Sequence, residues 1–273
     1  MTEILLVGFG KMGGALLKGW IRNNVVRNVL ILDPYIKEFP EKFSNFKYIR
    51  LYNNTNELPK NISPSMVVLA VKPQVMKEVL LELKFINVLK TCWLTVAAGL
   101  PIDFYENILG PKISIFRTIP NIPAEVSRGV TAIVRNKNCN QDQTLLAKNL
   151  LQSIGQLVEL DDENLMDAVT AISGSGPAYF YYLIEAMTFS GVSIGLSKQN
   201  ALKLARETFL GAAALLDKSE EDVSSLREAV TSPGGTTEAA LNTFQKNNKY
   251  FKLVKKAIIS ARDRGIDLAD QLK

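Results

Sequence analysis

The sequence contains no histidine among its 273 residues. Imidazole is the general base of Ser-His-Asp and Cys-His nucleophilic sites and supplies the ligands of HExxH zinc sites, so these site classes are excluded. Any reaction that the protein catalyses must therefore proceed without an imidazole acid or base.

Cysteine and long apolar runs are scarce as well. The two cysteines, Cys92 and Cys139, are too few for a disulfide framework and too far apart for a CxxC metal clip. No apolar run approaches the ~18 residues that cross a bilayer, and Met1–Ile4 lacks the basic n-region of a secretion signal. We therefore expect a cytoplasmic protein with no membrane partner and no metal site.

Positive charge is in modest excess, with 32 Lys and Arg against 27 Asp and Glu. The densest basic cluster covers residues 246–264, where Phe251, Val254, Ile258 and Ile259 recur at helical spacing. Most of the basic residues lie outside this apolar stripe, as expected for the solvent-exposed face of a packed terminal helix. A phosphate-binding surface is the alternative, but no groove-reading motif accompanies the cluster, so we expect no nucleic-acid partner.

The first half of the chain alternates short apolar runs with amphipathic stretches. Near-continuous apolar strands that alternate with helices indicate a parallel sheet covered on both faces. The predicted helices between strands are Met12–Ile21 and Val75–Leu89. The predicted strands are Ile4–Val7, Val29–Leu32, Tyr48–Leu51, Met66–Val71, Trp93–Ala97, Ile113–Thr118 and Val130–Val134.

After about Glu159 the pattern favours helices alone, predicted at Pro177–Gly191, Lys198–Leu216, Thr236–Phe244 and Lys249–Arg264. The sequence thus predicts a Rossmann-type doubly wound α/β domain at 1–159 and an all-helical domain at 160–273. The helix at 177–191 has almost no polar face, and a helix apolar all round is buried on all sides. We therefore expect the helical domain to associate with a second copy.

A glycine-rich loop follows the first predicted strand. Gly8-Phe9-Gly10-Lys11-Met12-Gly13 reads G-x-G-x-x-G, opens an amphipathic helix, and has Asp33 at the end of the next strand. This context is typical of dinucleotide binding: the first glycine allows a tight turn, the second lets the backbone approach the pyrophosphate, and the third lets the helix pack close. The helix N-terminus then supplies amide donors to the phosphates.

Asp33 bears on the choice of cofactor. A carboxylate at this position can accept hydrogen bonds from the adenosine-ribose hydroxyls and repels a 2′-phosphate, which favours NADH over NADPH. A turn aspartate before Pro34 is the alternative interpretation.

Two further loops follow predicted strands, Ala70-Val71-Lys72-Pro73-Gln74 and Ala97-Ala98-Gly99. In a doubly wound sheet such loops meet at the carboxyl edge, where the cofactor lies. The small residues leave room for a flat nicotinamide ring, although they also serve plain packing.

The helical half has two hydroxyl- and glycine-rich runs before helices, Ser173–Pro177 and Thr231–Thr237. Free amides and hydroxyls before a helix form an anion site, whereas a simple helix-start turn has the same composition. Pro177 suits the first position of a helix.

Taken in order, several of these stretches resemble pyrroline-5-carboxylate reductase, and the resemblance runs through nearly the whole chain. The matching stretches are Gly8–Gly13, Leu69-Ala-Val-Lys-Pro-Gln74, Ala97–Gly99, Arg117-Thr-Ile-Pro-Asn-Ile-Pro123, Ser173–Tyr179 and Arg227–Thr237. The resemblance implies a helical domain that dimerises, often with further assembly into rings, and NAD(P)H-dependent reduction of Δ1-pyrroline-5-carboxylate to L-proline, the last step of proline synthesis.

The same resemblance assigns roles by position. Asn56 would contact the adenosine end of the cofactor, Ala70, Lys72 and Pro73 would line its phosphates and ribose, and Ala97 and Asn121 would lie near the nicotinamide. Substrate would be held by Ser232, Gly235, Thr236 and Thr237. Family members often use NADPH and carry small or basic residues after the second strand, so Asp33 departs from that form.

The missing histidine agrees with this chemistry, because a protonated cyclic imine is already an electrophile and accepts hydride without a strong enzymic acid. We expect the amides near Gly235 and Thr236, with the Ser232 hydroxyl, to bind the substrate carboxylate and the Thr237 hydroxyl to bond the ring nitrogen.

The alternative functions are another imine reductase, a β-hydroxyacid-type reductase, and a non-catalytic nucleotide sensor. The second is disfavoured because no lysine lies between Lys148 and Lys198.

Overall fold

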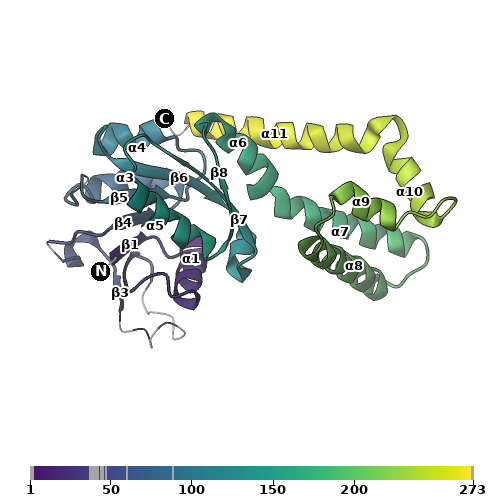
Figure 1. Ribbon diagram of the computed structural model, residues 1–273, viewed down its shortest axis with the longest axis horizontal. Coiled ribbons are helices and arrows are strands. Elements are labelled where there is room, and N and C mark those ends of the chain that lie inside the picture. Colours follow the sequence, from purple (N-terminus) through teal and green to yellow (C-terminus); the bar gives the residue numbers. More distant parts are fainter. Residues whose placement is uncertain are drawn as a thin grey trace. The chain divides into compact units, whose positions relative to one another are not determined.

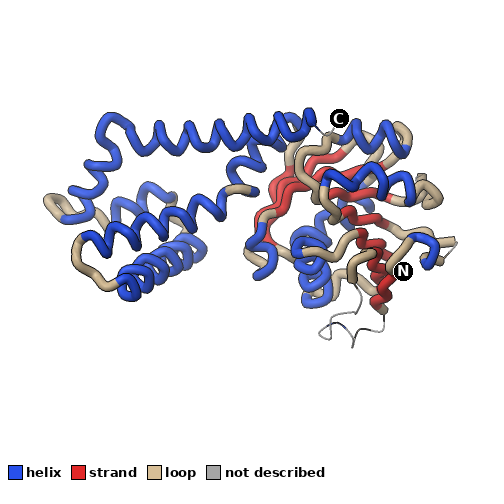
Figure 2. The backbone as a smooth tube through the Cα atoms, turned by 180° about the vertical axis from the view of Figure 1, so that it is seen from behind, coloured by secondary structure: helices blue, strands red, loops and turns tan. Residues whose placement is uncertain are grey.

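The computed structural model describes residues 3–36, 43, 46, 48–59, 61–87 and 89–271. The chain forms two compact units, one of Met1–Ser175 with Ala261–Lys273 and one of Gly176–Ser260. The strands lie in the first unit, and the second unit is built of helices, as Figure 2 shows. An α/β part followed by a helical part is therefore confirmed.

The first unit is built on one eight-stranded sheet with the order β3-β2-β1-β4-β5-β6-β7-β8 (Figure 1). The neighbours from β3 to β6 pair in parallel, and β3-β2-β1-β4-β5-β6 is the strand order of a dinucleotide-binding sheet. The strands are β1 Glu3–Val7, β2 Asn28–Leu32, β3 Ile49–Tyr52, β4 Met66–Leu69, β5 Cys92–Thr95, β6 Ser114–Pro120, β7 Gly129–Arg135 and β8 Gly155–Glu159.

The last two strands depart from the expected parallel sheet. β7 pairs antiparallel with β6, and β8 pairs parallel with β7. The connection from Pro120 to Gly129 is too short for a crossover helix, so the chain can only turn back beside β6. β8 was not predicted because Gly155–Glu159 is an edge strand with little apolar content and mostly exposed residues.

Successive side chains of the strands point to opposite faces, and each face has its own core. Ile4 and Leu6 of β1 join one core with α1 (Lys11–Arg22) and α5 (Gln141–Gln152). Leu5 and Val7 join the other core with α3 (Met76–Glu82) and α4 (Ile102–Leu109). The sheet is thus covered on both faces, and in sheets of this kind ligands bind outside the carboxyl ends of the strands.

The limits of these helices differ from the sequence prediction in one place. α3 ends at Glu82, not Leu89, because turns after it carry Leu83 and Ile86 into the core. α4 and α5 were not predicted, although Asn140 and Gln143 form a capping box at the start of α5 that the sequence spells out.

The segment after β8 explains why the units divide at Ser175 and not at the expected 159/160 boundary. It contains η4 (Glu163–Leu165), α6 (Met166–Val169) and the π-helical turn η5 (Thr170–Gly174). Met166 and Ala171 are fully buried in the first unit, and Glu163 bonds to a strand residue. The sequence pattern predicts the point after which the chain is helical, whereas the boundary between the compact units depends on which unit each helix packs against.

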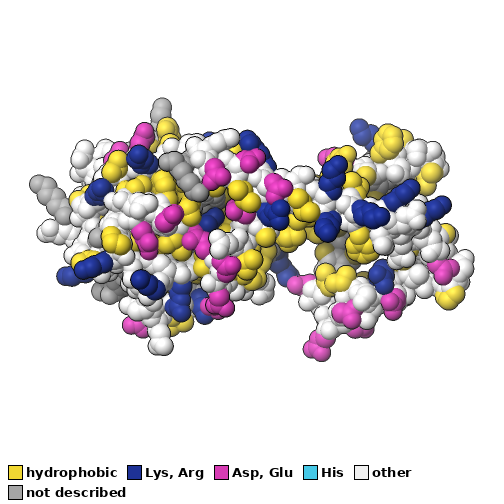
Figure 3. Space-filling model, turned by 90° about the horizontal axis from the view of Figure 1, so that it is seen from above, with side chains coloured by type: hydrophobic (Ala, Val, Ile, Leu, Met, Phe, Trp, Pro, Cys, Tyr) yellow, Lys and Arg dark blue, Asp and Glu magenta, His cyan; other side chains and the backbone are white. Residues whose placement is uncertain are grey.

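The second unit contains α7 (Gly176–Ser193), α8 (Lys198–Lys218), α9 (Val223–Ala229), α10 (Thr236–Gln245) and most of η6–α11 (Lys246–Asn248, Lys249–Gln271). α7 packs against α8, yet its large side chains stay exposed, with Phe189 at 78% and Tyr182 at 73%. Apolar side chains therefore lie at the surface of this unit among lysines and arginines (Figure 3). Across the described part of the chain, no helix combines the length and apolarity needed to cross a bilayer.

Candidate functional site

The glycine loop between β1 and α1 is shaped by close backbone contacts. Gly8 has a φ of +91°, and a Cβ there would lie 2.7 Å from the carbonyl oxygen of Ala70. A Cβ on Gly13 would lie only 2.2 Å from the carbonyl oxygen of Gly8. At Gly10, by contrast, no described atom lies within 4 Å of an added Cβ. The first and third glycines thus serve packing, and the second keeps the loop surface open to a ligand.

The N-terminus of α1 is free to face an anion. Gly10 is its N-cap, no side chain caps it, and the first turn contains no acidic residue. Backbone amides and the helix dipole therefore make this turn chemically suited to a phosphate. A hollow of about 460 Å³ lies beside this turn, lined by Phe9, Gly10, Lys11, Gly14, Ala15, Lys18, Ile36, Phe43 and Glu125.

Asp33 makes two backbone contacts, and one of them matches the interpretation of Asp33 as a turn residue. Its Oδ1 accepts a hydrogen bond from the Tyr35 amide at 2.9 Å, which is the turn contact, and its Oδ2 accepts one from the Phe9 amide at 2.7 Å. The second contact ties the end of β2 to the glycine loop. The carboxylate is buried and retains acceptor capacity for a further donor.

Asn56 lies in the turn that follows β3, the strand next to β2. It sits exposed in η1 (Thr55–Glu57), just after β3, whose last residue Tyr52 pairs with Leu32 of β2. Asn53 donates to the carbonyl oxygens of Asp33 at 3.1 Å and Ile36 at 2.7 Å, so the ends of β2 and β3 are held together. Asp33 and Asn56 thus share one end of the sheet edge.

The loops after β4 and β5 reach the same edge. Val7, Leu69 and Thr95 are aligned across β1, β4 and β5, so Gly8, Ala70 and the loop carrying Ala97 follow adjacent strands. Ala70 and Val71 are half-buried, Lys72 is exposed, and Pro73 opens η2 (Pro73–Val75). Ala97 is buried. The expected cofactor residues of these loops are therefore brought together.

Asn121, at the end of β6, is held by the protein itself. Its Oδ1 accepts a hydrogen bond from the Val130 amide at 3.0 Å, and its Nδ2 donates to the Ser173 carbonyl at 3.3 Å. The Ser173–Pro177 run forms part of the π-helical turn and the start of α7, which begins at Gly176, so Pro177 is its second residue. Asn121 therefore also fixes this turn against the sheet.

The hydroxyl-rich turn lies in the second unit and leads into α10. Gly234 has a φ of +72° and donates its amide to the Glu238 carboxylate at 2.7 Å, while the Gly235 amide bonds to the Ser232 carbonyl at 3.0 Å. Ser232 and Thr236 are exposed and Thr237 is half-buried. Gly235 is the N-cap of α10 and has no side-chain cap. The turn thus presents hydroxyls and first-turn amides suited to a small carboxylate.

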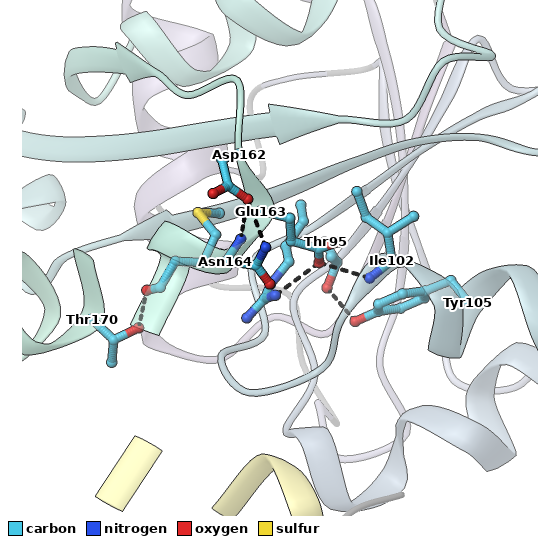
Figure 4. Close-up of polar contacts among 9 residues, drawn as sticks. Thr95, Ile102, Tyr105, Asp162, Glu163, Asn164 and Thr170 are labelled. Carbon is cyan, nitrogen blue, oxygen red and sulfur yellow. Dashed lines mark hydrogen bonds and ion pairs between the residues drawn. The ribbon is translucent and has the colours of Figure 1, made fainter. Parts of the chain in front are cut away.

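The structure also shows a polar cluster that the sequence analysis missed (Figure 4). The guanidinium of Arg117, buried in β6, donates to Glu163 Oε1 at 2.8 Å, and the same oxygen accepts from the Ile102 amide at 2.8 Å. The Tyr105 hydroxyl shares a hydrogen bond of 2.8 Å with Thr95 Oγ1. The sequence feature that could have indicated this cluster is Arg117, a single charged residue within an apolar strand.

Burial raises the pKa of the Tyr105 phenol above its usual value, and the hydrogen bond to Thr95 offsets only part of this effect. The phenol is therefore neutral throughout the physiological pH range, and its proton remains available for the hydrogen bond to Thr95.

The thiols of Cys92 and Cys139, distant in sequence, belong to the same core on one face of the sheet; Cys92 Sγ donates to the Trp93 carbonyl and Cys139 Sγ to the Ile115 carbonyl. The neighbouring Cys139 thiol and burial raise the pKa of Cys92, and the Cys92 thiol lowers the pKa of Cys139. No group of acidic, cysteine or histidine side chains in the described ranges could hold a metal ion.

Comparison with known proteins covers the whole chain. A family model described as pyrroline-5-carboxylate reductase dimerisation matches residues 163–268, and one described as NADP oxidoreductase, coenzyme F420-dependent, matches residues 3–91. A pyrroline-5-carboxylate reductase of Pseudomonas aeruginosa is 37% identical over 99% of this chain and 98% of its own. This chain belongs to the pyrroline-5-carboxylate reductase family.

Solved structures agree with this assignment. The pyrroline-5-carboxylate reductase of Coxiella burnetii has a TM-score of 0.87 at 31% identity, covering 100% of this chain and 98% of its own. The pyrroline carboxylate reductase of Plasmodium falciparum, solved with NADP bound, has a TM-score of 0.81 at 28% identity, covering 98% of both chains. The family resemblance inferred from the motifs is confirmed.

The dimerisation family model begins near the expected 159/160 boundary and includes α7 and the hydroxyl-rich turn. The expectation that the helical part takes part in association is therefore supported by the family assignment. The other family model, described as an NADP oxidoreductase, covers the glycine loop, Asp33, Asn56 and the Ala70–Pro73 loop, and this match supports a nicotinamide cofactor.

Proposed function

We propose that the protein reduces 1-pyrroline-5-carboxylate to L-proline, the last step of proline synthesis, with a reduced nicotinamide dinucleotide as the hydride donor. The observation that carries the proposal is the match to pyrroline-5-carboxylate reductases along the full chain, at 37% identity for the relative from Pseudomonas aeruginosa. The glycine loop fits such a cofactor, since a Cβ at Gly10 meets no described atom and the α1 N-terminus is uncapped.

The reaction needs orientation more than acid catalysis. The substrate is a cyclic imine whose nitrogen is protonated, so its ring carbon is electrophilic before it meets the enzyme. The bound nicotinamide supplies a hydride to that carbon, and the electron pair of the C=N bond stays on nitrogen, giving the secondary amine of proline. The protein has to align the two ligands and exclude water. Because these requirements do not include an imidazole acid, the absence of histidine is compatible with the reaction.

The first unit holds the cofactor in this proposal. The Gly8–Gly13 loop binds the pyrophosphate, Asp33 and Asn56 bind the adenosine end, and Ala70, Val71, Lys72 and Pro73 line the phosphates and ribose. Ala97 and Asn121 lie toward the nicotinamide. These assignments are supported by the alignment of the three loops along one sheet edge.

We further propose NADH as the preferred donor. The carboxylate of Asp33 stands at the end of β2 with acceptor capacity left after its two backbone contacts, and its charge disfavours a 2′-phosphate. The relative from Plasmodium falciparum was solved with NADP, so the ratio of rates with NADH and NADPH is the measurement that decides.

Substrate binding is assigned to the turn before α10. Because the Gly235 amide bonds to the Ser232 carbonyl, the Thr236 amide that follows Gly235 and the Ser232 hydroxyl bind the substrate carboxylate. The Thr237 hydroxyl bonds the ring nitrogen, which makes Thr237 the catalytic residue. The exposure of Ser232 and Thr236 and the uncapped N-terminus of α10 support this assignment.

The functional unit is proposed to be a homodimer formed through the helical unit, where α7 exposes Tyr182 and Phe189. Light scattering of Phe189→Glu should show a smaller particle than the wild type. Phe85→Glu, which alters an apolar side chain on the first unit that is 50% exposed, is the matched control and should leave the mass unchanged. The wild-type mass also tests assembly into rings; a compact wild-type monomer would contradict the proposal.

The activity is tested by mixing the purified protein with pyrroline-5-carboxylate and either NADH or NADPH while following absorbance at 340 nm. Oxidation of at least one cofactor, with proline as the product, is expected. A β-hydroxyacid and other cyclic imines serve as comparison substrates. Cofactor binding without turnover of any of them would make the protein a nucleotide-binding relative and refute the proposal.

A further inference from the structure

The loop after β5 is held by polar contacts at both of its ends. At its start, the Ala97 amide donates to Thr95 Oγ1 at 3.2 Å, and this hydroxyl is also bonded to Tyr105. At its end, the Ile102 amide, the first of α4, donates to the Glu163 carboxylate at 2.8 Å. The loop therefore spans two fixed amides, as Figure 4 shows for Thr95, Ile102, Tyr105 and Glu163.

Glu163 reaches this amide from a part of the chain that is distant in sequence. It opens the 3₁₀ turn η4, after β8, and its side chain is 28% exposed. The same carboxylate oxygen that accepts from Ile102 also accepts from Arg117 Nη1. Because one oxygen serves both donors, the position of the α4 N-terminus depends on the position of the guanidinium.

Arg117 is itself firmly placed. It lies in the middle of β6 between Thr95 of β5 and Val134 of β7, and it is 5% exposed. Its Nε has no hydrogen-bond partner in the described structure, so Glu163 is the acceptor that compensates its buried charge. A buried arginine with one carboxylate partner fixes the direction of that carboxylate closely.

The loop lies on the side of the sheet edge away from Asp33. In the strand order, β5 is separated from β2 by β1 and β4. A dinucleotide that crosses the edge at β1 places its two halves on opposite sides of that strand. If Asp33 and Asn56 hold the adenosine half, the loop carrying Ala97 meets the nicotinamide half.

We propose that Glu163, held by Arg117, is a positioning residue for the nicotinamide half of the cofactor, acting through the loop between Thr95 and Ile102. This inference rests on the proposed function. Its consequence is that loss of the Glu163 charge weakens the hold on the nicotinamide ring and leaves the adenosine half almost unaffected.

The test compares two ligands that differ by the nicotinamide. Dissociation constants are measured by calorimetry for the reduced dinucleotide that the wild type prefers and for ADP-ribose, or its 2′-phosphate if that dinucleotide is NADPH. For Glu163→Gln, which keeps an acceptor for Ile102 but removes the charge, we expect about tenfold weaker binding of the dinucleotide. Binding of the ADP-ribose ligand should change less than about twofold.

Two further variants complete the design. Arg117→Lys keeps a charge but loses the planar guanidinium, and it should show the same selective loss if it folds. Asp161→Ala removes an exposed carboxylate two residues from Glu163, outside the η4 turn that Asp162 caps. This matched control should leave both dissociation constants unchanged, and thermal unfolding of each variant checks that the fold is intact.

The outcomes separate this inference from the proposed function. An equal loss for both ligands, no loss for either, or the same selective loss in Asp161→Ala would each overturn the positioning role. A wild type that binds neither NADH nor NADPH would instead overturn the proposed function. With saturating cofactor, kcat of Glu163→Gln should also fall, since the reacting carbon is less well aligned.

Discussion

The second and third glycines of the G-x-G-x-x-G loop should fail in opposite ways when each is replaced by alanine. Gly13 is buried in the first turns of α1, and its added Cβ would lie 2.2 Å from the Gly8 carbonyl oxygen. Gly10 has an extended backbone that alanine adopts readily, and its Cβ would meet no described atom within 4 Å. One substitution therefore damages the fold and the other damages the ligand site.

The magnitudes follow from these distances. Alanine gains about 1 kcal/mol over glycine in a helix interior, but at Gly13 a backbone carbonyl has to move by most of an ångström, and overpacking of this kind costs up to ~3 kcal/mol. The net loss is roughly 2 kcal/mol, or a Tm lower by about 4–8 °C for a unit of this size. Gly10→Ala should keep Tm within about 2 °C while binding the cofactor at least about tenfold more weakly, because its methyl group occupies the path of the pyrophosphate.

Differential scanning fluorimetry and calorimetric titration with NADH and NADPH measure the two effects. Gly14→Ala is the control for stability, since Gly14 lies in the same helix and its added Cβ meets no described atom; it should raise Tm by a few degrees through helix propensity alone. Unchanged cofactor binding by Gly10→Ala would refute the assignment of the loop to the pyrophosphate. An unchanged Tm for Gly13→Ala would refute the packing argument.

Three further predictions concern single side chains. Thr237→Ala should lower kcat/KM for pyrroline-5-carboxylate roughly 10- to 100-fold at unchanged Tm, with Thr237→Ser restoring most of it; an unchanged kcat/KM would remove the catalytic assignment. Asp33→Ser should shift the ratio of rates toward NADPH, and a constant ratio would leave Asp33 as a turn residue that ties down Phe9. The pKa of Cys139 is lowered and that of Cys92 is raised, so iodoacetamide at neutral pH should label Cys139 first. As the pH is raised, the rate of Cys139 labelling should level off at a lower pH than the labelling rate of a free thiol. Mass spectrometry that finds Cys92 labelled first would contradict this prediction.

The glycine loop shows how far sequence reasoning reaches. The spacing of Gly8, Gly10 and Gly13 and their place between strand and helix are local properties, and the structure gives each glycine the local surroundings expected. The same holds for the strands that form the middle of the sheet, because their residues are apolar on both faces.

Other features depended on partners that spacing does not reveal. The pattern at Asp33 allowed a turn or a ribose contact, and only the fold shows its bond to Phe9 across the loop. The antiparallel β7 and the edge strand β8 follow from a short connection and a sheet edge, not from residue type. The predicted division at 159/160 followed helical pattern, whereas Met166 and Ala171 pack with the first unit.

The glycine loop between strand and helix, the α/β-then-helical order, the apolar helix and the absence of imidazole chemistry could all be predicted from the sequence, because each depends only on residue types and on neighbouring residues. Tertiary structure alone decided that Arg117, Glu163 and the Ile102 amide meet, and that Cys92 lies against Cys139. Such contacts join residues far apart in the chain. Which side chains meet is decided only by the packing of the sheet and its helices.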